Sequence, residues 1–229
     1  MGYLHVWAII ISVKLAKIHR KIEPVWHVQA AIVAAIVVQI FLSKEFIVGP
    51  RYALAIFEGL LLVAISLPAS KRPHPSHVVL RRVLAIVLLA LISLTNIASL
   101  VLVSNSLLNG SITDGHILIY SALIIYATNI IVFGLLYWEL DGRTAKGAPD
   151  GIRDFLFPQM SASDTDTKQP DWQPTFFDYL YVSVTNATAF SPTDAMPLTY
   201  RAKLLMTVQG FTSLATIALV AARAVNILK

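Results

Sequence analysis

The sequence predicts an all-α integral membrane protein with about five transmembrane helices, a short re-entrant helix and an N-terminal amphipathic surface helix. Hydrophobic residues make up 56% of the 229 residues and charged residues only 14%, which excludes an ordinary soluble domain. Several long apolar runs alternate with short polar connections, as membrane spans do. One apolar stretch near the C-terminus is too short to cross a bilayer and ends in hydroxyl, amide and proline residues.

The N-terminal segment, residues 1–22, predicts an amphipathic helix that lies on the membrane surface. A short apolar run containing Trp7 is followed by several lysine and arginine side chains. This combination is typical of helices that bury one face at the headgroup boundary. Pro24 ends the helix.

Four apolar runs in residues 25–140 predict a four-helix membrane domain. They are Val25–Ser43, Tyr52–Pro68, Val83–Leu108 and His116–Leu140. The first carries alanines at a spacing that suits close helix packing, and the second is slightly short for a span. The fourth ends in Tyr137 and Trp138, a pair typical of the aromatic belt at the membrane interface. Residues 141–174 are polar and rich in Gly, Pro, Ser and Asp, so we expect an exposed loop with little structure.

The residues 175–229 combine a short apolar helix, a polar connection and a long final span. The apolar stretch Phe176–Val184 covers less than half of the roughly 20 residues that a bilayer requires. Non-helical polar backbone at membrane depth persists only inside protein or along a water-filled cavity. The layout therefore predicts a re-entrant pore helix, a pore loop and then a full span at Leu204–Leu228.

This segment resembles the pore module of the potassium-channel superfamily. The matching pieces are Phe177-Asp178-Tyr179-Leu180-Tyr181-Val182-Ser183, then Thr185 and Thr188, then Thr193-Asp194-Ala195-Met196-Pro197. The resemblance covers roughly the last quarter of the chain and makes Arg201–Leu228 the inner helix. It implies a filter-like constriction formed by Thr185, Asn186, Thr188, Ser191, Pro192, Thr193 and Asp194. It also implies a homotetramer, because each chain supplies one pore loop.

The filter differs from the family pattern at the positions that set selectivity. Ser191 and Thr193 stand where the family has glycines, and Pro192 lies between them. Stacked filter carbonyls need backbone angles that residues with a Cβ resist, and proline fixes its own φ. We therefore expect a path for monovalent cations that is not selective for potassium. The resemblance also implies that Asp194 braces the loop through donors such as Tyr179.

Two other functions fit the same segment. In a non-conducting scaffold or complex subunit the loop would be retained without an ion path, and Asn186 and the threonines would cap helix ends. A small-solute transporter would use Glu58 together with the broken segment as its central site. Convergence of Glu58 with residues 185–194 in one chain would favour the transporter.

Polar side chains inside the predicted spans are the remaining candidates. They are Glu58, Asn96, Asn129, Gln209 and Arg223. Glu58 needs a partner because a buried carboxylate is costly, either a bound proton or cation, or a structural pair with Arg223, Asn96 or Asn129. The amides are expected to be isolated interhelical hydrogen-bonding groups, and Arg223 to extend to the headgroups.

The sequence favours no enzyme, cofactor, metal site or nucleic-acid partner. The chain has no cysteine, and no phosphate loop, nucleophile elbow or catalytic carboxylate pair occurs. The net charge of +5 comes from basic residues beside apolar spans, where the lipid bilayer explains them. We expect a multi-pass protein of the cell membrane.

The direction of the pore loop is open at this point. Basic residues in the N-terminal segment and at 71–82 favour the cytoplasm for both, and residues 109–115 contain no lysine or arginine. The pore loop would then start from the cytoplasm. The potassium-channel module starts from outside.

Overall fold

The computed structural model describes the helical part of the chain. The described residues are 26–47, 50–66, 75–110, 114–145, 153–161, 172–188 and 195–227. The expected surface helix at residues 1–22 lies outside them, and so do four of the filter-like candidates, Ser191, Pro192, Thr193 and Asp194.

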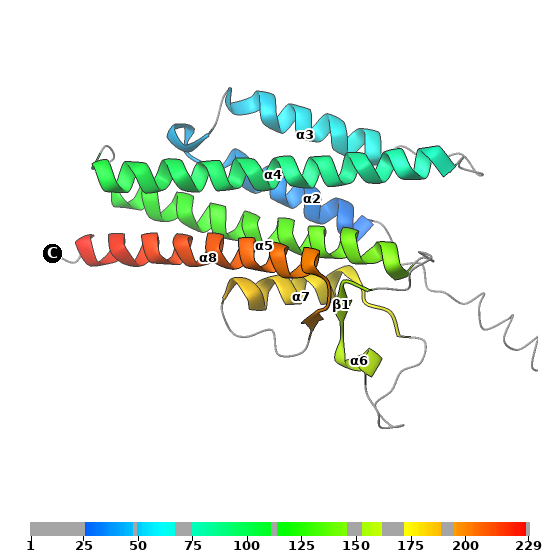
Figure 1. The fold of residues 1–229 in the computed structure, drawn as a ribbon. Helices are drawn as coiled ribbons and strands as arrows, with labels where there is room; N and C mark the ends of the chain where they lie inside the picture. The colour runs from blue at the N-terminus through cyan, green and yellow to red at the C-terminus, as the bar shows by residue number, and fades with distance from the viewer. Residues whose placement is uncertain are drawn as a thin grey trace, which may run out of the picture.

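Five long helices run back and forth in one bundle of the described chain (Figure 1). They are α2 (Trp26–Ile40), α3 (Arg51–Ser66), α4 (Pro75–Asn109), α5 (Gly115–Ala145) and α8 (Tyr200–Ile227). A helix therefore stands at the place of every predicted span, and the predominantly helical class is confirmed. Three of the helices, α4, α5 and α8, are long and apolar enough to cross a membrane. α2 and α3 have 15 and 16 residues, which is less than the roughly 20 that a span needs.

Shorter elements lie along one side of the bundle, below α8 in Figure 1. They are β1 (Phe155–Leu156), α6 (Pro158–Ser161), α7 (Phe176–Ala187) and β2 (Met196–Pro197). A 3₁₀ turn at Lys44–Phe46, η2, lies between α2 and α3 in the sequence. β1 and β2 pair antiparallel, with Phe155 opposite Pro197 and Leu156 opposite Met196. The expectation that residues 141–174 have little structure is wrong for 153–161, because Phe155 and Phe157 are buried in the core of the bundle.

α5 is the central helix, because α2, α4, α7 and α8 all pack on it. α3 packs on α2 and α4, on the far side of the bundle from α7 (Figure 1). α5 and α7 approach closely at Gly134, where an added Cβ would lie 3.1 Å from the Leu180 Cα. Glycine thus allows the backbone of α7 to lie against α5.

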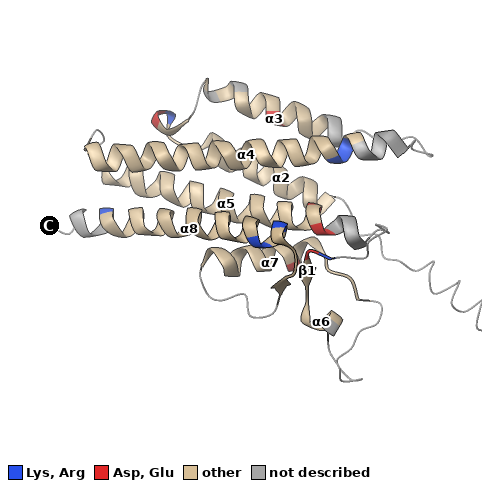
Figure 2. Ribbon diagram, viewed as in Figure 1, with Lys and Arg blue, Asp and Glu red and all other residues tan. Residues whose placement is uncertain are grey.

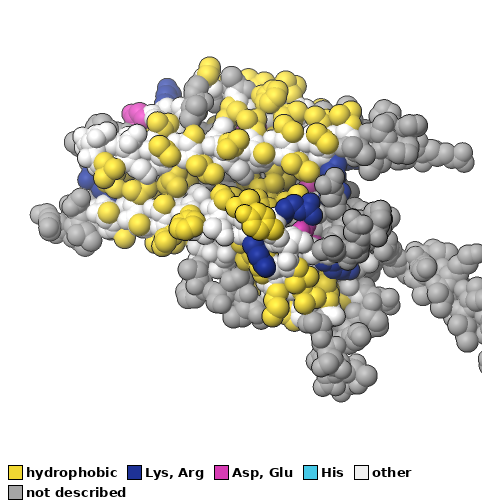
Figure 3. Space-filling view, viewed as in Figure 1, with side chains coloured by type: hydrophobic (Ala, Val, Ile, Leu, Met, Phe, Trp, Pro, Cys, Tyr) yellow, Lys and Arg dark blue, Asp and Glu magenta, His cyan; other side chains and the backbone are white. Residues whose placement is uncertain are grey.

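The outer surface of the bundle is apolar. Charged side chains are few in Figure 2, and besides those near the two ends it shows Lys or Arg on α8 above α7 and an acid on α3. Hydrophobic side chains cover much of the face seen in Figure 3. Exposed residues on α4 and α8 include Leu94, Val101, Phe211 and Leu214. A helical bundle with so many apolar side chains on its exterior fits a lipid environment.

Candidate functional site

The segment from α7 to β2 starts and finishes at the same end of the bundle. Near the start of α7, the Tyr179 hydroxyl donates to the carboxylate of Asp141, close to the end of α5. The backbone N–H of Asp154 donates to the same carboxylate over 2.6 Å. β1 follows Asp154 directly and pairs with β2, so the chain has returned to its starting level by Met196.

Between these points α7 extends to the middle of the neighbouring spans. The Ser183 hydroxyl donates to the carbonyl oxygen of Ile130 over 2.6 Å. Ile130 lies about 16 Å along α5 from Asp141, at 1.5 Å per residue. The Asn186 amide donates to the carbonyl oxygen of Met206 over 2.9 Å, two turns into α8. α7 therefore ends beside the middle of α5 and the first turns of α8.

The ends of α7 are set by local side-chain chemistry. At its start, Asp178 accepts hydrogen bonds from the backbone N–H of Thr175 over 2.7 Å and from its hydroxyl over 2.8 Å. Such a reciprocal cap fixes where a helix begins. At its end, the Thr188 hydroxyl donates to the carbonyl oxygen of Val184 over 2.9 Å. The last turn of α7 carries no basic residue.

A buried amide at mid-depth joins α5, α7 and α8. The Gln209 Oε1 accepts from the Tyr137 hydroxyl over 2.5 Å and from the Asn186 amide over 2.8 Å. The Gln209 Nε2 donates to the Ser183 hydroxyl over 2.6 Å and to its carbonyl oxygen over 2.9 Å. Both lone pairs and both protons of this fully buried amide are used.

Asn129 extends the network. Its Nδ2 donates to the Ser213 hydroxyl over 2.8 Å and reaches the backbone carbonyl of Gln209 at 3.4 Å. Asn96, in contrast, donates to the carbonyl oxygen of Ile125 over 3.0 Å and links α4 to α5. All three amides bond between helices, as predicted. The expectation that each is isolated is wrong for Asn129 and Gln209, because they share one network.

Two tyrosines have different positions from those that the sequence indicates. Tyr137 is predicted at the interface belt, yet it is fully buried and hydrogen-bonded to Gln209. Tyr179 is predicted as a donor to Asp194, yet its hydroxyl proton is donated to Asp141. Both positions depend on long-range contacts that the local sequence does not show, namely the packing of α7 on α5 and the folding of residues 153–161 against the bundle.

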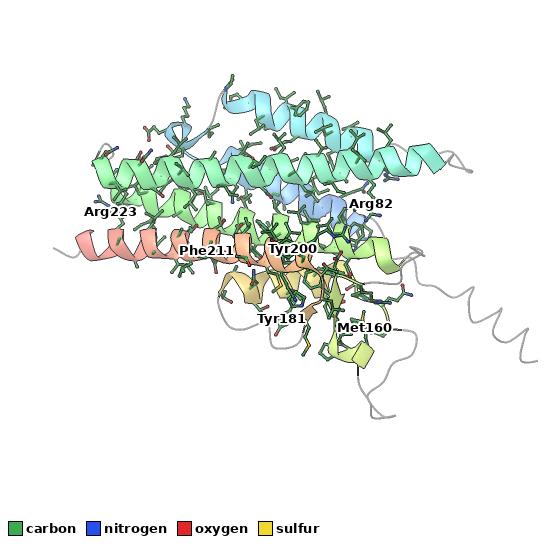
Figure 4. All side chains as sticks on the ribbon, viewed as in Figure 1. Arg82, Met160, Tyr181, Tyr200, Phe211 and Arg223 are labelled. Carbon is green, nitrogen blue, oxygen red and sulfur yellow. The ribbon has the colours of Figure 1, made fainter. Side chains whose placement is uncertain are left out.

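The described candidate residues of the constriction already have hydrogen-bond partners, two within α7 and one on α8. Thr185 and Thr188 donate their hydroxyl protons to carbonyl oxygens of α7 itself. Asn186 is engaged with α8. The outward side of α7 is apolar and aromatic, with Tyr181 58% exposed (Figure 4). The threonine oxygens keep free lone pairs, whereas the Asn186 amide nitrogen is used in packing.

A second polar cluster, which the sequence did not single out, holds the returning strand at the bundle end. The buried carboxylate of Asp154 accepts a hydrogen bond from the Thr199 hydroxyl and lies 3.7 Å from the guanidinium of Arg201. Its carbonyl oxygen accepts from the backbone N–H of Leu198 over 2.9 Å. Asp154 thus joins β1 to the start of α8, and Asp141 joins β1 to α7.

Glu58 and Arg223 lie away from this site and from each other. Glu58 is fully buried on α3. No described residue donates a hydrogen bond to either of its carboxylate oxygens. Arg223 lies near the end of α8, at the opposite end of the bundle from Arg82 (Figure 4), beside Leu107 and Leu118. The structural pairing of Glu58 with Arg223, Asn96 or Asn129 is therefore wrong.

Comparison of the chain with models of protein families, with curated protein sequences and with solved structures finds no match. Within the described ranges no three His, Cys, Asp or Glu side chains lie where they could hold a metal ion. What the site offers is a helix end with carbonyl and hydroxyl oxygens at the middle of an apolar bundle.

Proposed function

We propose that the chain is one subunit of an oligomeric membrane protein that conducts monovalent cations, with the connection after α7 at the narrowest point. The carrying observation is that α7 starts at one end of the bundle, ends at mid-depth beside Gln209 and is followed by a return to the same end. Irregular polar backbone at that depth requires protein or water around it.

The charge of the helix end supports cations over anions. A helix C-terminus carries a partial negative charge from its unpaired carbonyl groups. α7 has no basic side chain in its last turn to oppose that charge. Thr185 and Thr188 add hydroxyl oxygens there, and such oxygens can replace part of the hydration shell of a cation.

Association of several copies is part of the proposal, because one re-entrant segment does not enclose a path. α8 is the least buried of the three candidate spans. Its uncovered side combines Leu204 and Phe211 with the small residues Ala215, Ala218 and Ala222. Small residues allow close helix approach, and the potassium-channel resemblance makes four copies the expected number. In this arrangement the five helices are all spans, with α2 and α3 shorter than the rest.

The test is particle symmetry together with current. In lipid nanodiscs we expect a four-fold particle, and in planar bilayers a cation current with little discrimination between potassium and sodium. Thr188→Val should lower the current. Thr216→Val is the matched control, because Thr216 bonds to its own helix in the same way but lies within α8. A monomer without current, or equal currents in both variants, would refute the proposal.

A non-conducting scaffold is the second candidate. It is favoured by the engagement of Thr185, Asn186 and Thr188 in helix capping and packing. The transporter has weaker support, since α3 with Glu58 packs on α2 and α4 while α7 packs on α5 and α8. An ordered oligomer that passes no ion would favour the scaffold.

A further inference from the structure

Glu58 is a buried carboxylate that the proposed cation path does not use. Its side chain is fully buried, and neither oxygen receives a hydrogen bond from a described residue. A carboxylate in an apolar bundle without a cation or hydrogen-bond donor is strongly disfavoured in its charged form. Binding one proton removes that charge.

A small cavity lies about one helical turn from Glu58 along α3, and Glu58 itself does not line it. Its volume is about 30 Å³, which is room for one or two water molecules. The polar side chains that line it are Gln39, Thr95, Asn96 and Ser99. Leu54 and Ala55 also line it, and they lie one helical turn before Glu58 on the same face of α3. Water in the cavity would therefore be next to the turn that carries Glu58.

No described charged group competes for Glu58. The titratable side chain of α2 is His27, which stacks on Trp26 at the start of that helix. On α4 the described charged side chains are Arg81 and Arg82, near its beginning, and Arg82 is paired with Glu139 at 3.4 Å. Tyr52, on α3 itself, is exposed.

We propose that Glu58 is a reversible proton-binding site inside the bundle, which exchanges its proton with water in the cavity between α2, α3, α4 and α5. A proton suits this site better than a metal ion, because no group of acidic or histidine side chains surrounds it in the described chain. The inference does not depend on cation conduction by the α7 segment.

Carbodiimide labelling tests the proposal on the unmodified protein. Dicyclohexylcarbodiimide is apolar and reacts with protonated carboxyl groups. In nanodiscs we expect mass spectrometry to find the label at Glu58 and not at the exposed Glu45. Labelling should fall as the pH rises and should not change with sodium concentration. Absence of label at every pH would overturn the proposal, and protection by sodium at constant pH would show a metal-cation site instead.

Infrared spectroscopy tests the route of exchange. The carbonyl band of a protonated carboxylic acid should be absent in Glu58→Gln and should shift when water is replaced by D₂O. Ser99→Leu fills the cavity and should slow that shift several-fold. Ser104→Leu is the matched control, because Ser104 does not line the cavity. Equal slowing in both variants, or a band that never shifts, would overturn the cavity route.

Discussion

Replacing Gln209 with leucine should weaken the attachment of α7 to α5 and α8 and lower the stability of the protein. The substitution removes four hydrogen bonds. Gln209 accepts one from Tyr137 and one from Asn186, and it donates two to Ser183. A buried bond contributes about 0.6–1 kcal/mol net, so the free energy of unfolding should fall by roughly 2–4 kcal/mol. Leucine is close to glutamine in size, so little of this loss would come from a cavity.

The assay is reversible unfolding in detergent, combined with a double-mutant cycle. Tyr137→Phe removes a single hydroxyl and should cost about 1 kcal/mol. The double variant should lose less stability than the sum of the two single losses. The difference should be at least about 0.5 kcal/mol, since contacting residues typically show coupling energies of about 0.5–3 kcal/mol. Thr207→Leu, on the exposed side of α8, is the control and should change stability little. Additive losses, or a Gln209→Leu protein as stable as the parent, would refute the network.

Two further predictions concern how α7 and residues 153–161 are attached to the bundle, and a third concerns sidedness. Gly134→Ala should lower the free energy of unfolding by about 1–3 kcal/mol, because the added Cβ would press on the Leu180 backbone. Gly210→Ala, where an added Cβ would meet nothing within 4 Å, should raise the free energy of unfolding by up to about 1 kcal/mol. Equal effects of the two variants in unfolding assays would contradict this prediction. The Asp141 carboxylate accepts three hydrogen bonds, and Asp141→Asn should weaken them. Amide hydrogen exchange of residues 153–161 should then become faster. Unchanged exchange would show that Asp141 does not hold this segment against the bundle. A cysteine at position 163 should react with an impermeant thiol reagent only from the cytoplasmic side; reaction from outside would instead support the potassium-channel orientation.

The last of these predictions rests on where the bundle places its basic residues. Arg82, near the start of α4, pairs with Glu139, two residues before Asp141. The start of α7 therefore lies at the same end of the bundle as Arg81 and Arg82. From the positive-inside rule we predict that this end faces the cytoplasm.

Apolar runs were enough to predict where the helices lie, because the length of a run and the polarity of its flanks are local properties. The shortness of α7, which has 12 residues, was predictable for the same reason, because the apolar stretch Phe176–Val184 is short. The predicted run Val25–Ser43 is longer than α2, because polar residues such as Ser43 are tolerated at the end of a span.

Partners within the bundle were not predictable. Tyr137 and Gln209 are separated by 72 residues, and Asn129 and Ser213 by 84. Nothing in the local sequence of either partner indicates the other. Asp154 was likewise hidden in a polar stretch, because its burial depends on the pairing of β1 with β2.

The course of the segment from α7 to β2 affects how many times the chain crosses a membrane. Because the segment starts and ends at the same end of the bundle, it adds no crossing and does not change the side on which the following helix begins. α2 starts and α8 finishes at opposite ends of the bundle (Figure 1). If the five long helices all cross, reporters fused before α2 and after α8 would lie in different compartments.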